Sequence, residues 1–196
     1  MSSYLVLLIS LFLFSYLLGS IPTSYLVSKW KGVDLLTVGS GNLGATNVYR
    51  ALGLKLALFV FFCDLLKGFF SSFLAVYFEF PPLMHIIVGA FAVLGHSCSI
   101  FMKFKGGKGV ATGLGVILSI NYHVFIILFL MGILFIKLTS TVSLVSIFGA
   151  ILFPFLLIIF KVSLVYIIFA CLLSLYIIYL HRLNILRLFK GTENKI

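Results

Sequence analysis

Long runs of apolar side chains decide what this chain can fold into. A helix that crosses the hydrocarbon core of a bilayer needs roughly 20 predominantly apolar residues. Five runs of about that length are clear: Tyr4–Val27, Leu56–Phe78, Leu83–Met102, Leu138–Phe160 and Val162–Leu180. Only 9% of the 196 residues are charged, whereas a soluble domain carries charge on about 25%. We therefore expect an all-α, polytopic membrane helical bundle, with residues 1–196 as one domain.

A sixth apolar stretch, Val110–Ile136, determines the number of spans because Asn121-Tyr122-His123 interrupts it. Lys and Arg favour the cytoplasmic side of a membrane. The loops after the first and third runs and the C-terminal tail are basic, whereas the Glu79–Pro82 connection carries no Lys or Arg. An unbroken stretch gives six spans and an external tail, and a split gives seven and a cytoplasmic tail. We expect seven spans, with the N-terminus outside and the C-terminus cytoplasmic; six is the alternative.

The balance of charges indicates anionic partners. Fourteen Lys and Arg stand against four Asp and Glu, so phosphate-bearing ligands and anionic lipid headgroups are the expected classes. The basic residues lie in short loops between spans, which argues against nucleic acid. The four carboxylates are far apart in the sequence, whereas two-metal and Ca²⁺ sites need clustered carboxylates. We expect no metal site.

Glycines and neutral donors fill the first polar segment, Gly39–Arg50. Closely spaced glycines allow positive φ and let backbone N–H groups converge on an anion. Arg50 can bind phosphate with two parallel hydrogen bonds. The expected phosphate-binding residues of this segment are Gly39, Ser40, Gly41, Asn42, Thr46, Asn47 and Arg50. An ordinary glycine-rich turn is the alternative.

Two further polar segments have similar chemistry. Lys103–Thr112 places cations and glycines at the start of a helix, where the helix dipole also favours anions; anchoring at lipid headgroups is the alternative. Directly after the last span, His181–Arg187 combines a histidine, an asparagine and two arginines. The expected ligand-binding residues of these segments are Lys105, Gly106, Gly107, Lys108, His181, Arg182, Asn184 and Arg187.

Asp64 and Lys67 lie three residues apart on one face of the second span. Charged residues within a membrane are costly and mark functional regions by default. The pair can equally be a structural ion pair, and both interpretations stay open. In this interpretation Asp64 lies in a span and outside the polar loops.

Several motifs extend from the first apolar run to the C-terminus. Gly39–Arg50 fits GSGNxGATNxxR, Gly95-His96 is followed by FKGGKGVAT, and the chain ends on HRxNIxRLxxGTE. Gly19–Pro22 and Asp64–Gly68 add two shorter matches. Together they resemble the bacterial acyl-phosphate:glycerol-3-phosphate acyltransferases, the PlsY family. One position departs from the family pattern: Ser99 stands where proline is usual.

The resemblance implies a membrane enzyme that moves a fatty acyl group from acyl phosphate to the sn-1 hydroxyl of glycerol 3-phosphate. It implies lysophosphatidic acid and phosphate as products, seven helices, no metal, no coenzyme A and no other cofactor. It also implies the bacterial cytoplasmic (inner) membrane as the location, with the active site facing the cytoplasm. The expected partners are the two substrates and membrane lipids, with transient contact to the enzyme that makes acyl phosphate.

The expected mechanism uses no general base from the protein. No histidine is followed by Asp in an H-x4-D pair, and neither of the first two loop motifs contains a carboxylate that could orient a histidine. We therefore expect a substrate phosphate oxygen to accept the hydroxyl proton, with catalytic support from Ser40, Lys108, His181 and Asn184. The alternative function is a small phosphate or organophosphate transporter, although transporters usually show repeated halves and neither glycine-rich loop recurs.

Overall fold

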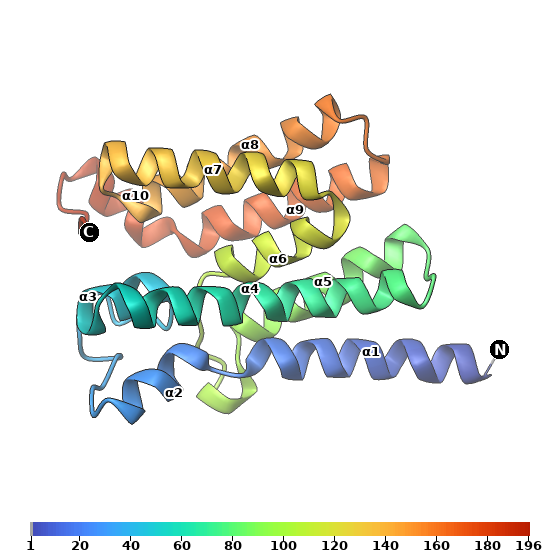
Figure 1. Cartoon of the computed structure of the whole chain (residues 1–196), viewed down its shortest axis with the longest axis horizontal. Coiled ribbons are helices and arrows are strands. Elements are labelled where there is room, and N and C mark those ends of the chain that lie inside the picture. Colours follow the sequence, from blue (N-terminus) through green and yellow to red (C-terminus); the bar gives the residue numbers. More distant parts are fainter. Residues whose placement is uncertain (1) are drawn as a thin grey trace. The chain divides into compact units, whose positions relative to one another are not determined.

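The structure, a computed structural model, describes residues 2–196, with side chains from Tyr4 onward. Helices make up most of these residues (Figure 1). They are α1 (Ser2–Ser20), α2 (Thr23–Trp30), α3 (Ala45–Leu52), α4 (Leu54–Tyr77), α5 (Pro82–Ser97), the 3₁₀ helix η1 (Ile100–Met102), α6 (Val110–Ile120), α7 (Tyr122–Thr139), α8 (Val142–Ile159), α9 (Leu164–Leu180) and α10 (Arg182–Phe189). The all-α fold that the apolar runs predict is confirmed.

The chain divides into two compact units, one up to Ile120 and one from Asn121 to Ile196. In the first unit, α4 packs against α6, α5, α3 and α1, and α1 also packs along α5 (Figure 1). Glycines allow the closest approaches: a Cβ at Gly68 would collide with the carbonyl of Thr112, and one at Gly115 with the carbonyl of Leu65. Small residues at helix contacts are the usual means of close packing inside membranes.

The first apolar run, expected as one helix over Tyr4–Val27, is a candidate membrane span from Tyr4 to Trp30, but a short break divides it into two helices. Helix α1 ends at Ser20 and α2 begins at Thr23. Pro22 lies in the break, and it has no N–H to donate to the preceding turn. Ser20 and Ser24 are buried on either side of the break.

The stretch Val110–Ile136 breaks where its polar residues indicated. Helix α6 ends at Ile120, and α7 begins at Tyr122. The Asn121 side chain accepts a hydrogen bond from the Val124 N–H at 3.1 Å, which is the usual role of an N-terminal helix cap. By contrast, α8 continues through Pro154.

Helix length and apolar composition identify the candidate membrane spans among residues 2–196. Four stretches pass both criteria: Tyr4–Trp30, Leu54–Tyr77, Tyr122–Thr139 and Val142–Ile159. A fifth, Leu164–Leu180, passes together with α10, from which it is bent by 60°. Two shorter apolar helices remain, Pro82–Ser97 and Val110–Ile120.

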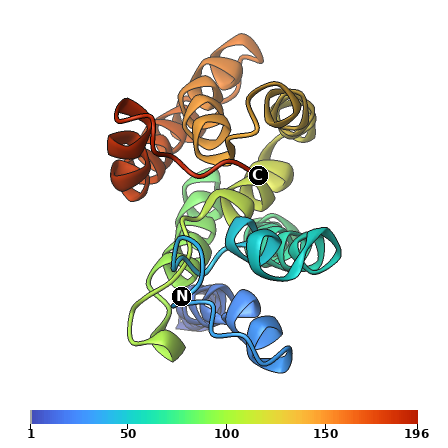
Figure 2. The same ribbon diagram turned by 90° about the vertical axis from the view of Figure 1, so that its left-hand side faces the viewer.

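Contacts between distant segments show which parts of the chain lie together at an end of each unit. In the first, the Tyr4 and Phe80 rings lie 4.9 Å apart, so α1 starts beside the α4–α5 turn. The segment before α3 and the α5–α6 connection lie side by side in this unit (Figure 2). In the second unit, Ile196 donates its N–H to the Ser140 carbonyl at 2.8 Å, so the C-terminal tail lies at the α7–α8 turn.

Candidate functional site

The first glycine-rich loop folds around one amide side chain. Asn47 is buried at 1% exposure, and its Nδ2 donates to the carbonyls of Leu35 at 3.0 Å and Val38 at 2.9 Å. Its Oδ1 accepts the Ser40 N–H at 2.9 Å. Gly39 has φ +61°, and a Cβ there would collide with Asn47 Oδ1. The loop therefore takes its shape from a residue in the first turn of α3.

Most of the expected phosphate-binding residues of this loop lie on its accessible side. Gly39 and Ser40 are exposed; Gly41, Asn42, Thr46 and Arg50 are partly exposed. Arg50 lies in the last turn of α3, with its Cδ 3.7 Å from where a Cβ of Gly39 would be. Asn47 differs, because its amide is engaged with the backbone of the loop. In this structure it shapes the loop, and the donors that face outward belong to its neighbours.

The second loop begins with a tight turn after α5. The Ser99 carbonyl accepts the Phe104 N–H at 2.8 Å, and Lys103 and Phe104 both have left-handed φ, 52° and 60°. A backbone bridge pairs Ser99 with Lys105. Lys105 is exposed, and Lys108 is half-buried just before α6 begins.

Ser99, which departs from the family pattern, suits its position. Its φ of −67° is the value that proline fixes. Its hydroxyl donates to the Ser20 carbonyl at 2.5 Å, a hydrogen bond that proline cannot make. The substitution therefore keeps the backbone conformation and adds a contact to the end of α1.

At Gly106 and Gly107 the second loop packs against the end of α5 and against the first loop. The Gly107 N–H donates to the His96 carbonyl at 3.0 Å. A Cβ at Gly106 would collide with the His96 carbonyl, and one at Gly107 with His96 Nε2. The Leu43 carbonyl lies 2.8 Å from the same Cβ position of Gly107. The two glycine-rich loops, far apart in the sequence, are thus in contact.

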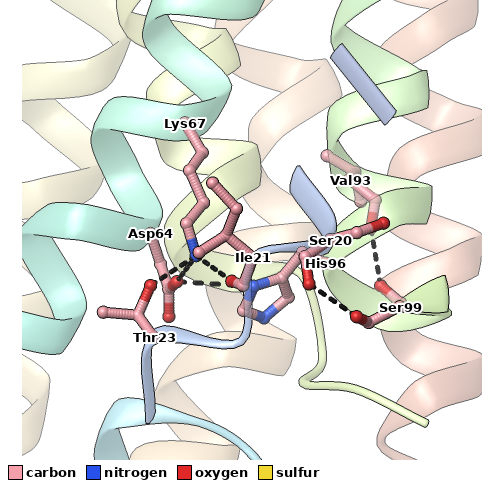
Figure 3. A network of polar contacts seen from close by, with 9 residues as sticks. Ser20, Ile21, Thr23, Asp64, Lys67, Val93, His96 and Ser99 are labelled. Atoms are coloured by element: carbon pink, nitrogen blue, oxygen red, sulfur yellow. Dashed lines mark hydrogen bonds and ion pairs between the residues drawn. The ribbon is translucent and has the colours of Figure 1, made fainter. Parts of the chain in front are cut away.

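Beneath these loops lies a buried group of charged residues (Figure 3). Lys67 Nζ donates to Asp64 Oδ1, Thr23 Oγ1 and the Ile21 carbonyl, each at 2.6 Å. His96 Nδ1 lies 3.7 Å from Asp64 Oδ1. A small cavity is lined by Asp64 and His96 together with Ser20, Thr23, Lys105, Gly106 and Gly107.

Asp64 lies in α4 and outside the polar loops, as its position in the second apolar run indicated. Asp64 belongs to a span, but through His96 it adjoins the second loop. The spacing of Asp64 and Lys67 revealed the pair, and Gly95-His96 was part of the second motif. Asp64 and His96 lie close together because α4 packs against α5, and the sequence pattern does not predict that packing.

The third motif folds around a carboxylate to which the sequence analysis gave no role. Glu193 Oε1 accepts hydrogen bonds from Asn184 Nδ2 at 2.6 Å and Ser143 Oγ at 2.8 Å. Its Oε2 accepts from Arg187 Nε at 2.8 Å. Gly191, with φ +67°, turns the chain so that Glu193 reaches back to α10. Burial acts to raise the pKa of Glu193, but the hydrogen bonds from Arg187, Asn184 and Ser143 outweigh it and hold the pKa below its ordinary value.

His181 lies at the junction of α9 and α10 and is 3% exposed. Its Nδ1 is 2.8 Å from the Ile177 carbonyl. A carbonyl can only accept, so Nδ1 carries the proton, and the acceptor of the neutral imidazole is Nε2. Arg182 is exposed and lies over the Tyr179 ring, 4.4 Å from its centroid.

The chemistry of these groups suits anions. Backbone N–H groups, hydroxyls, amides, guanidinium and ammonium groups are all donors, and charge-assisted hydrogen bonds to phosphate are the strongest that such groups make. Among residues 2–196, no three His, Cys, Asp or Glu side chains are grouped as metal ligands.

Comparisons with known proteins agree over nearly the whole chain. A family model described as glycerol-3-phosphate acyltransferase matches residues 9–191. The chain is 45% identical over 187 residues to a glycerol-3-phosphate acyltransferase of Prochlorococcus marinus (strain MIT 9215), covering 93% of this chain and 94% of the relative. It is 42% identical over 195 residues to that of Geotalea daltonii, covering 99% and 98%.

Two crystal structures are also similar. Both are of PlsY (YgiH), described as an integral membrane glycerol 3-phosphate acyltransferase, and each match covers 96% of this chain and 95% of the other. The glycerol 3-phosphate form has a TM-score of 0.93 at 42% identity. The lysophosphatidic acid form has a TM-score of 0.90 at 41% identity.

The Glu193 cluster predicts a specific loss of stability in acid. A folded-state pKa below the ordinary value of 4.5 stabilises the fold above about that pH, and the stabilisation is lost as pH falls through the lowered pKa. Glu193→Gln should therefore unfold at a lower temperature than the wild type at neutral pH, and the difference should shrink below pH ~4.5. Thermal unfolding in detergent measures this. The exposed Glu79→Gln variant is the control, and an equal gap at every pH contradicts the prediction.

Proposed function

The chain belongs to the glycerol-3-phosphate acyltransferase family, and on that basis we propose that it moves a fatty acyl group from acyl phosphate to the sn-1 hydroxyl of glycerol 3-phosphate. The products are lysophosphatidic acid and inorganic phosphate. The observation that supports this proposal most directly is the contact between the two glycine-rich loops, which carry Ser40, Arg50 and Lys105. Membership of an enzyme family also decides against the transporter.

Phosphate on both proposed substrates explains the excess of cations. Ser40, Arg50 and Lys108 bind substrate phosphate, assisted by backbone N–H groups of Gly39, Gly41, Gly106 and Gly107. Asn42, Thr46, Lys105, Arg182 and Arg187 supply further donors. Asn47 contributes by holding the first loop, because its amide bonds the backbone of Leu35, Val38 and Ser40. Both units serve one acyltransferase domain.

The proposed reaction needs no cofactor. The glycerol hydroxyl oxygen attacks the acyl carbon, a phosphate oxygen of a bound substrate takes the hydroxyl proton, and the bond from the acyl carbon to phosphate breaks. A phosphate monoester has a second pKa of about 6, which suits a proton acceptor near neutral pH. Ser40, Lys108, His181 and Asn184 position the reactants and stabilise developing charge. Two observations support this: Asp64 is buried against Lys67, and His181 Nδ1 bonds a carbonyl.

The first experiment tests both the identity of the acyl donor and the binding of substrate phosphate. Purified wild-type protein in detergent, given acyl phosphate and glycerol 3-phosphate, should release phosphate and lysophosphatidic acid in equal amounts. Arg50→Ala should weaken substrate binding by roughly 1.5–3 kcal/mol, because one charged contact is lost, which is about 10- to 150-fold in KM. Exposed Lys161→Ala is the control. Normal KM and turnover in Arg50→Ala would contradict the assignment.

The second experiment tests the absence of a protein base. In His181→Ala, turnover should still fall as the pH drops through about 6, because the second pKa of the substrate phosphate lies at about that value. Small bases such as imidazole should not restore its turnover. Loss of a true general base costs about 10²–10⁴-fold in rate. If His181→Ala no longer loses turnover in acid and imidazole restores its rate, His181 is the general base.

We also propose seven spans in the cytoplasmic membrane, with the glycine-rich loops and the C-terminal tail in the cytoplasm. Counting Tyr4–Trp30 as one crossing, α4 to α9 supply six more. Helix α6 is short, at 11 residues or roughly 17 Å. Five of its residues are buried, and a short span is tolerated where protein covers it. The start of α1 beside the α4–α5 turn, and the tail beside the α7–α8 turn, are consistent with this topology.

Thiol labelling in intact cells distinguishes the two span counts. In a variant without Cys63, Cys98 and Cys171, a membrane-impermeant reagent should label Glu79→Cys, which lies in the external turn. The same reagent should label Asn194→Cys only after the cells are opened. Rapid labelling of Asn194→Cys in intact cells would instead support six spans.

A further inference from the structure

We propose that Asp64, Lys67 and His96 form a positioning network that holds the two glycine-rich loops in register. The inference rests on the proposed function, in which these loops bind substrate phosphate. It assigns a role to three residues that lie outside the phosphate-binding and catalytic set. The network connects the α1–α2 break to His96 of α5 (Figure 3), and His96 contacts Gly107 of the second loop.

The first step is the attachment of the break to α4. An ammonium group has three N–H donors, and Lys67 uses them on the Ile21 carbonyl, Thr23 Oγ1 and Asp64 Oδ1. Where a helix breaks inside a membrane, its released backbone groups must find partners within the protein. The Ile21 carbonyl accepts the Thr23 N–H at 3.0 Å and also Lys67 Nζ, so the start of α2 is tied to α4.

The second step leads from α2 to the first glycine-rich loop. Val27 of α2 belongs to a buried apolar cluster with Leu35, Leu43 and Val48. Leu35 also accepts the Asn47 amide that shapes the loop. A displacement of α2 therefore moves the packing surface on which the loop rests.

The third step leads to the second loop. His96 Nδ1 faces Asp64 at 3.7 Å, and its Nε2 occupies the space of a side chain at position 107. The His96 carbonyl accepts the Gly107 N–H, and Gly107 abuts the Leu43 carbonyl of the first loop. The imidazole thus lies between the buried carboxylate and the point where the two loops meet.

Burial separates this role from direct catalysis. The side chains of Asp64, Lys67 and His96 are 4%, 6% and 8% exposed. A buried ion pair also adds little net stability over apolar packing, while removal of one partner leaves an uncompensated charge. The hydrogen bonds from Lys67 Nζ to the Ile21 carbonyl and Thr23 Oγ1 are directional contacts that an apolar side chain could not provide. The network should therefore act on the position of the loops, which sets KM, and leave the chemical step intact.

The experiment compares Lys67→Met and His96→Ala with the wild type, using purified, monodisperse protein. In both variants, KM for glycerol 3-phosphate should rise at least about tenfold, with turnover at saturation changed by less than about threefold. Combining the two substitutions should raise KM by less than the product of the single effects, because residues of one network do not act additively. Lys67→Arg, which keeps donors and charge, should recover part of the loss. Exposed His123→Ala is the matched control.

A second measurement reads binding without turnover. Glycerol 3-phosphate alone should raise the unfolding temperature of the wild type and of His123→Ala, and should raise that of Lys67→Met and His96→Ala less at the same concentration. Unchanged KM and unchanged stabilisation in the folded variants would overturn the network, and so would a loss confined to turnover. If Lys67→Met does not fold, His96→Ala decides by the same criteria. If the wild type binds glycerol 3-phosphate without transferring acyl groups, the proposed function fails while the network is still tested by binding.

Discussion

The arrangement of the first unit depends on one ammonium group that lies where a membrane helix is broken. Pro22 ends the regular hydrogen bonding of α1, and a bilayer has no water to replace it. Lys67 of α4 donates hydrogen bonds to the Ile21 carbonyl in the break and to Thr23 Oγ1 at the start of α2. Asp64 compensates the charge locally. Because the break is anchored, a polar loop can follow a membrane helix at a fixed position and still be open to a soluble substrate.

The two loops are built in different ways. The first takes its shape from one amide, Asn47, which bonds three backbone groups. The second has no such side chain; a left-handed turn and two glycines press it against His96. Glu193 has a role in the second unit like that of Asn47 in the first, since it joins α10 to the start of α8. In each case one polar side chain with little exposure holds together segments that are separated in the sequence.

The sequence predicted the features that depend on local chemistry. Apolar runs predicted helices, and three consecutive polar residues located the α6–α7 break, where Asn121 caps the new helix. The interruption at Pro22 was missed because apolar residues continue on both sides of it. The contacts of Asp64 with His96 and of Lys67 with Ile21 were missed for another reason: His96 comes from α5 and Ile21 from the α1–α2 break, and only packing brings them to α4. Glu193 belongs to the third motif, but its hydrogen bond with Ser143 spans 50 residues.

Asn47 shows how narrow the chemical tolerance of such a loop is. Aspartate has nearly the same shape but only accepts hydrogen bonds when ionised. At this position it would face two carbonyl oxygens with no proton to share, and would place a negative charge under Ser40 and near Arg50. Hydrolysis of this one amide, a common form of chemical ageing in proteins, would therefore remove two donated hydrogen bonds and weaken the attraction of the loop for anions. The burial of Asn47 limits the access of water to the carbon–nitrogen bond on which the shape of the loop depends.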